Sequence, residues 1–187
     1  MALERSFEEL AAAYRRLAEV LAELRLNVVE DHPLWDESLL VDSYGDATTQ
    51  LEGLSQEGAV AAAEGTLAAA YPVDVEHARR DLANAQRAHN AIARAFAAEL
   101  TSYSRLDQLI GLGRERGGEW AVWTAVVRES LQRCTSPLVE VADALFRCWQ
   151  EMVERVGLGS ISVQNRVIGQ EITLPAAEVK ETSEHVV

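Results

Sequence analysis

The sequence predicts an all-α fold: an elongated antiparallel four-helix bundle of long coiled-coil-like helices, followed by a short C-terminal extended or β segment and a mobile tail. Two observations support this. Apolar residues recur every three or four positions through most of residues 3–156, whereas they alternate with polar residues between 161 and 174. Ala, Leu, Glu and Arg dominate the composition, which is typical of helices. We expect three parts: a helical bundle domain (1–157), an extended or β-like docking segment (158–174) and a flexible polar tail (175–187).

The first two helices are expected over residues 3–30 and 34–70, separated by a turn at Pro33. The first carries an apolar seam, formed by Phe7, Leu10, Tyr14, Leu17, Leu21, Leu24 and Val28. The second should face inward through Leu40, Tyr44, Leu51, Leu54 and Leu67. Its later half is rich in Ala and contains Gly53, Gly58 and Gly65, each of which weakens a helix by about 1 kcal/mol relative to Ala. Such a surface indicates either close packing of another backbone or local looseness.

The third helix is expected from residue 75 to about 116, with Asp74 as its cap, and the fourth from 119 to about 156. Pro137 should kink or divide the fourth helix. We expect seven of its residues to be buried: Trp120, Trp123, Leu131, Leu138, Leu145, Trp149 and Met152. Because the first helix is the shortest, one end of the bundle should lack it, and the segment 161–174 or another protein should cover that end.

Charge is sorted along the chain. The 53 residues between Arg25 and Arg79 contain eleven acidic residues and no Lys or Arg, whereas residues 79–116 contain seven Arg and four acidic residues. The second helix should therefore pack beside the third. The net charge of −13 argues against nucleic acid or an anionic membrane as the main partner. Charged residues near the start argue against a signal peptide, and the Arg-rich, Ala-rich composition suggests a bacterial protein, expected in the cytoplasm.

The sequence carries no catalytic motif, and we assign no catalytic, cofactor-binding or metal-binding residue. Asp74 and His77 lack the Glu-x-x-His pattern of a di-iron bundle, so a helix start explains them better. His89 lies on an apolar helix face and is expected to be a core histidine. Cys134 and Cys148 are expected to be buried thiols rather than redox or metal-binding groups.

We therefore predict a non-enzymatic scaffold or adaptor subunit that binds a protein partner or self-associates. The alternative is a bundle that binds a small ligand or cofactor in its core, where the Gly/Ala surface would give room. For the segment 161–174, strand addition to a partner and folding back on the bundle remain equally open. The candidate partner-binding residues are Trp149, Met152, Val156, Ile161, Val163, Val167 and Ile172.

Overall fold

The computed structural model is a helical bundle and describes residues 2–29, 38–100, 103–156, 161–165 and 170–174. Its elements are α1 (Ala2–Val29), α2 (Ser38–Ala69), α3 (Val75–Ala95), the π-helix η1 (Phe96–Leu100), α4 (Tyr103–Arg116), α5 (Gly118–Arg133), α6 (Thr135–Val156), β1 (Ile161–Asn165) and β2 (Gln170–Leu174). In the described residues, no helix is both long and apolar enough to span a membrane.

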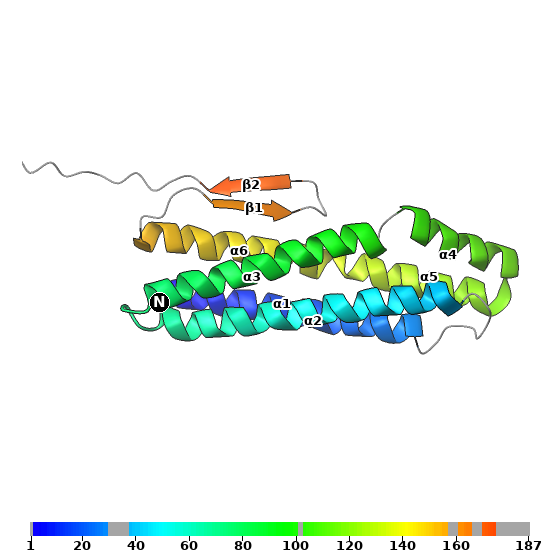
Figure 1. Ribbon diagram of the computed structural model, residues 1–187, viewed down its shortest axis with the longest axis horizontal. Helices are drawn as coiled ribbons and strands as arrows, with labels where there is room; N and C mark the ends of the chain where they lie inside the picture. The colour runs from blue at the N-terminus through cyan, green and yellow to red at the C-terminus, as the bar shows by residue number, and fades with distance from the viewer. Residues whose placement is uncertain (1, 30–37, 101–102, 157–160, 166–169, 175–187) are drawn as a thin grey trace, which may run out of the picture.

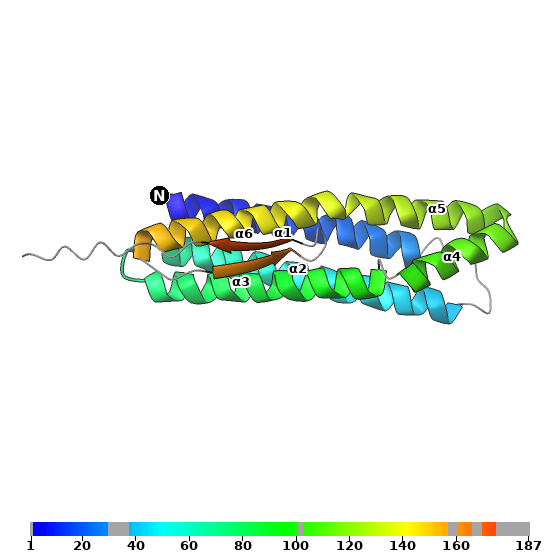
Figure 2. The same ribbon diagram turned by 90° about the horizontal axis from the view of Figure 1, so that it is seen from above.

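The helices lie lengthwise beside one another, so the bundle is much longer than it is wide (Figures 1 and 2). Helix α1 packs against α2, α5 and α6, and α3 packs against α2 and α6. The predicted neighbourhood of the acidic second helix and the arginine-rich third is therefore confirmed. Helix α4 packs against α5 at the end of the bundle away from the start of α1 (Figure 1).

The apolar seam of α1 is the centre of the core. All seven seam residues are buried, as the three-and-four spacing predicts, and the start of the helix adds the buried Leu3. The seam residues are Phe7, Leu10, Tyr14, Leu17, Leu21, Leu24 and Val28. Helix α1 therefore packs its apolar stripe into a core that it shares with α2, α5 and α6.

Two aromatic rings of α1 pack directly against glycines of α2. A Cβ atom at Gly58 would overlap the ring of Tyr14, and one at Gly65 would overlap the ring of Phe7. The two rings are seven positions apart in α1, and the two glycines are seven positions apart in α2. The earlier ring meets the later glycine, so α1 and α2 run in opposite directions. Close packing thus explains these two glycines, whereas Gly53 has no neighbouring atom within 4 Å of such a Cβ.

The predicted bundle end without the first helix is wrong. Leu3 is buried, and Ala2 and Leu3 line a groove together with Arg155 of α6. At the same end, Arg155 Nη1 donates a hydrogen bond to the carbonyl oxygen of Ala69, 3.2 Å away, at the end of α2. The 28 residues of α1 nearly match the 32 of α2, and the pairing of Phe7 with Gly65 brings the start of α1 to this end.

The predicted third helix is divided into three elements, α3, η1 and α4. The π-helix η1 follows α3 directly, and its Phe96 and Leu100 are buried. Tyr44 of α2 donates a hydrogen bond from Oη to the carbonyl oxygen of Leu100, 2.9 Å away. This bond ties the end of η1 to α2. Beyond it, α4 departs from the line of α3 (Figure 1).

The predicted fourth helix is divided at Cys134, between α5 and α6, as Pro137 indicates. Pro137 is the third residue of α6, where its missing N–H removes no hydrogen bond within the helix. The N–H of Leu138 then donates to the carbonyl oxygen of Cys134 at 3.2 Å. The predicted burial of seven residues is confirmed for Trp120, Trp123, Leu131, Leu138, Leu145, Trp149 and Met152. Trp123 also donates from Nε1 to the carbonyl oxygen of Asn27, 3.0 Å away, and so ties α5 to α1.

Strands β1 and β2 pair antiparallel, with Ile161 opposite Leu174 and Val163 opposite Ile172. Strand β1 contacts α6 and α3, and β2 contacts α6. Figures 1 and 2 show the strand pair lying lengthwise along these helices, so it follows the bundle instead of projecting from it.

Candidate interaction surface

The candidate partner-binding residues fall into three groups. Trp149 and Met152 belong to the hydrophobic core of the chain, with exposed fractions of 6% and 0%, so they have almost no surface to offer a partner. The backbone of Ile161 and Val163 lies in β1, and that of Ile172 lies in β2. Val156 is the last residue of α6, with its side chain outside the described residues, and Val167 lies outside them altogether. Of the predicted residues, Ile161, Val163 and Ile172 are thus the ones that lie in the strand pair.

The edges of this strand pair are its main chemical feature. Within the described residues the sheet has only β1 and β2, so each strand has a neighbouring strand on one side. A strand edge presents N–H donors and C=O acceptors in a regular row, which is the template for pairing with a further strand. A strand edge is the feature that the predicted strand addition would use.

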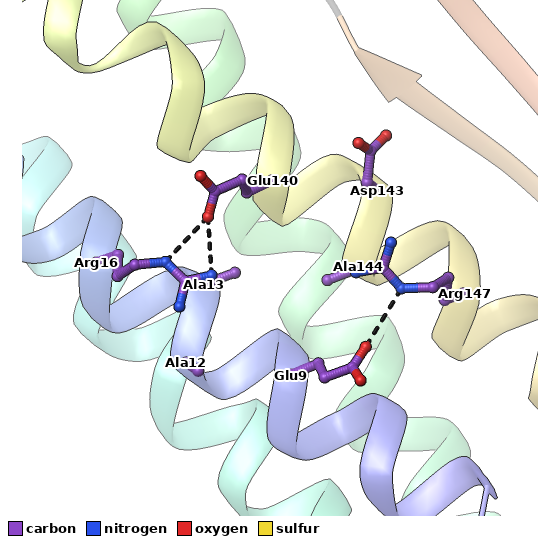
Figure 3. Close-up of a pocket in the computed structure, with 8 residues that line it drawn as sticks. All are labelled: Glu9, Ala12, Ala13, Arg16, Glu140, Asp143, Ala144 and Arg147. Atoms are coloured by element: carbon purple, nitrogen blue, oxygen red, sulfur yellow. Dashed lines mark hydrogen bonds and ion pairs between the residues drawn. The ribbon is translucent and has the colours of Figure 1, made fainter.

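A second surface, the groove between α1 and α6, is lined by charged side chains (Figure 3). Arg16 bonds to Glu140 through Nε at 2.9 Å and Nη2 at 2.8 Å, and Glu9 pairs with Arg147 at 3.4 Å. Both pairs are about half exposed, and such pairs contribute about 0–1 kcal/mol each. We interpret the groove as a set of ion pairs that align α1 with α6, because each labelled arginine in it already has a carboxylate partner.

Buried hydroxyl and thiol groups occur at two levels of the core. Tyr14 Oη donates to the carbonyl oxygen of Ala85, and Tyr14 lies near Cys148. At the other level, Tyr44 bonds to Leu100 and lies near Cys134. His89 is fully buried, as expected of a core histidine. Among the described residues, no cluster of three or more His, Cys, Asp or Glu side chains could hold a metal ion.

The two thiols should be chemically inert in the folded protein. Burial raises the pKa of Cys134 to about 12, and burial also raises the pKa of Cys148. Since the thiolate is the reactive form, we expect iodoacetamide at pH 8 to alkylate both at least about 100-fold more slowly in the native protein than in urea. Mass spectrometry of alkylated peptides measures this. Rapid native alkylation at either site would contradict the buried placement.

The same burial sets the response to alkaline pH. The folded pKa of Cys134 lies above the ordinary value of 9.0, so its contribution to stability is complete below about pH 9. As pH rises from about 9 to 12, the unfolded thiol ionises first and stability is lost, by about 1.4 kcal/mol per pH unit for each proton involved. Burial raises the pKa of Tyr14 and Tyr44 too, which adds to the loss above about pH 10. Urea unfolding at pH 8 and pH 10.5 checks this direction.

Comparison with known proteins identifies no relative: no protein-family model, no curated protein and no solved structure matches the chain.

Helix α2 carries an exposed apolar stripe that its sequence was not predicted to form. Leu67, which was predicted to face inward, is exposed, and so are Val60 before it and Tyr71 just after the helix. The signal was present, because residues 57, 60, 64, 67 and 71 also follow three-and-four spacing. The stripe is hard to recognise in the sequence because Glu57 and Glu64 occupy alternate positions on this face, so the face resembles an ordinary charged one.

Proposed function

We propose that the protein is a non-enzymatic scaffold or adaptor subunit of a bacterial cytoplasmic complex. Its four long segments, α1, α2, α3 to α4 and α5 to α6, would form an antiparallel bundle that carries the strand pair as a docking element. The observation that carries this proposal is the position of β1 and β2 along α6 and α3, each with a neighbouring strand on one side within the described residues. The bundle provides a rigid base, and the strand pair provides an edge.

Strand addition is the binding mode that this arrangement favours. A two-stranded hairpin is marginal in water, and contact with the helices gives it support. A partner strand would extend the sheet and satisfy main-chain groups at an edge. Self-association by the same edge is the second form of this proposal.

The competing function, a small ligand held in the bundle core, has less support. The Gly/Ala surface of α2 that would have given room for a ligand is filled at Gly58 and Gly65 by the rings of Tyr14 and Phe7. The groove between α1 and α6, with a volume of about 350 Å³, is lined by ion pairs at the surface and not by an apolar interior. Interaction with protein therefore remains the proposal.

Two truncations test the proposed function. Deleting residues 158–187 removes the strand pair, whereas deleting only residues 175–187 keeps it and serves as the matched control. We expect both proteins to retain helical circular dichroism. Only the longer deletion should lose the native mass of the complex, measured by light scattering on material purified from the native host.

The opposite result is equally clear. If the protein without residues 158–187 keeps its partners and its oligomeric state but melts at a lower temperature, the strand pair acts only as a clamp on the bundle. The docking proposal would then be wrong.

A further inference from the structure

The outward face of α2 carries a second helical seam, which we call the outer seam: Glu57, Val60, Glu64, Leu67 and Tyr71. We infer that the outer seam docks an amphipathic helix of another protein, one that presents basic side chains beside its apolar residues. This inference rests on the proposed role as an interaction subunit, and it assigns a second surface and the chemistry of the partner.

Among the residues whose side chains the structure describes, most of the exposed large apolar side chains lie here or in the turn that follows. Val60, Leu67 and Tyr71 expose 58%, 69% and 62% of their surface, and Val73 in the following turn exposes 90%. Single exposed apolar residues are common on soluble proteins, but a run of them along one face indicates an interaction site. The opposite face of α2 is already occupied, because Gly58 and Gly65 receive the rings of α1.

The spacing of the outer seam suits one partner helix. Steps of three and four residues keep the five side chains on one stripe, the geometry by which two helices pack along their length. Tyr71 lies beyond the end of α2, but the turn continues through hydrogen bonds from Ala70 N–H to Thr66 O and from Tyr71 N–H to Ala68 O, both 3.2 Å. Tyr71 therefore extends the seam by another turn.

A groove beside the seam offers room for a partner side chain. It lies between α2 and α3, has a volume of about 390 Å³ and includes Glu57 of the outer seam. Its apolar wall consists of Leu54, Ala61, Ala88 and Ala91. Asn84 and Arg87 of α3 complete the lining, and Arg87 donates a hydrogen bond to Asn84. A large apolar side chain of the docked helix could insert against the apolar wall.

Charge selects the partner. The acidic positions Glu57 and Glu64 alternate with Val60 and Leu67, and both glutamates are exposed. A second copy of this chain docked seam to seam would bring glutamates together, which is unfavourable, so self-association through this face is disfavoured. A helix with Lys or Arg opposite the glutamates would instead gain charge complementarity, with binding that weakens as salt rises.

Two synthetic helical peptides test the inference with the full-length protein. Both carry the same leucine heptad pattern, but one has Lys and Arg at the flanking positions and the other has Glu. We expect fluorescence anisotropy to show binding of the basic peptide only. The double change Val60→Gln and Leu67→Gln should weaken that binding at least tenfold, whereas Val122→Gln, at an exposed apolar residue of α5, should leave it unchanged.

A second pair of variants separates docking from general attraction to an acidic protein. Glu57→Gln with Glu64→Gln should weaken binding of the basic peptide, whereas Glu119→Gln with Glu129→Gln, also exposed and equal in net charge change, should not. Equal effects of the two pairs, equal binding of the acidic peptide, or no binding at all would overturn the inference. So would a dimer that Leu67→Gln dissociates, because the occupant would then be a second copy.

The strand pair does not enter this test. The protein lacking residues 158–187 should bind the basic peptide as the full chain does, provided that it keeps its helical circular dichroism. Loss of peptide binding on this deletion would contradict a site on α2. Failure of the outer seam and failure of the strand-docking proposal are thus observed in different variants.

Discussion

Replacing Trp149 with Ala should lower the free energy of unfolding by about 3–5 kcal/mol, the usual cost of removing a large aromatic side chain from a core. Trp149 lies in α6 with an exposed fraction of 6% and belongs to the same hydrophobic core as the α1 seam. Its removal would leave a cavity that neighbouring side chains fill only in part. Chemical denaturation followed by circular dichroism measures the change.

The matched control is Val122→Ala, because Val122 is 65% exposed on α5 and its loss should change stability by less than about 0.5 kcal/mol. A Trp149→Ala protein that melts normally but loses a partner would place this tryptophan in an interface instead. The structure makes that outcome unexpected, since the side chain has almost no surface for a partner to contact.

The sequence predicted the helical core well where large apolar side chains follow one clear period. The residues of the α1 seam are buried, and so are the seven residues predicted to be buried between Trp120 and Met152. In both sets, large apolar side chains follow one stripe along the helix. Pro137 likewise marked the division between α5 and α6, because a missing N–H has a direct geometric consequence.

The predictions were wrong where two faces of one helix, or the lengths of two helices, had to be compared. On α2, the inward face carries glycines and alanines and the outward face carries Leu67, so hydrophobicity alone selected the wrong side for that residue. The inward choice depends on the rings of Phe7 and Tyr14, which come from another helix. Similarly, the π-turn at Phe96–Leu100 has contacts that form only in the folded chain, such as the hydrogen bond from Tyr44. No residue within the segment predicts a π-turn by its type.

The wrong comparison of helix lengths also affected the predicted partner-binding residues. Trp149 and Met152 were chosen because the first helix was expected to leave one bundle end bare, and that end is occupied by the start of α1. The alternation from Ile161 to Leu174 was a local signal, and β1 and β2 lie within these residues. Which partner, if any, covers an edge is a property of two chains and cannot be found in one.

Replacing Gly65 with Ala should destabilise the protein by about 1–3 kcal/mol, although Ala is the better helix former. The added Cβ would overlap the ring of Phe7, and Gly58→Ala should behave alike because its Cβ would overlap the ring of Tyr14. Gly53→Ala is the matched control in the same helix. No atom lies within 4 Å of its added Cβ, so this change should stabilise the protein by about 0.5–1 kcal/mol.

A rescue experiment identifies the cause of the loss at Gly65. If the loss arises from overlap with the ring, combining Gly65→Ala with Phe7→Leu should cost less than the sum of the two single changes, because the smaller side chain makes room for the methyl group. Additive costs would mean that the two residues do not share a contact. A stabilising Gly65→Ala would mean that α1 and α2 are farther apart than the structure places them, and the order of Phe7 and Tyr14 along Gly65 and Gly58 would no longer define how the two helices pair.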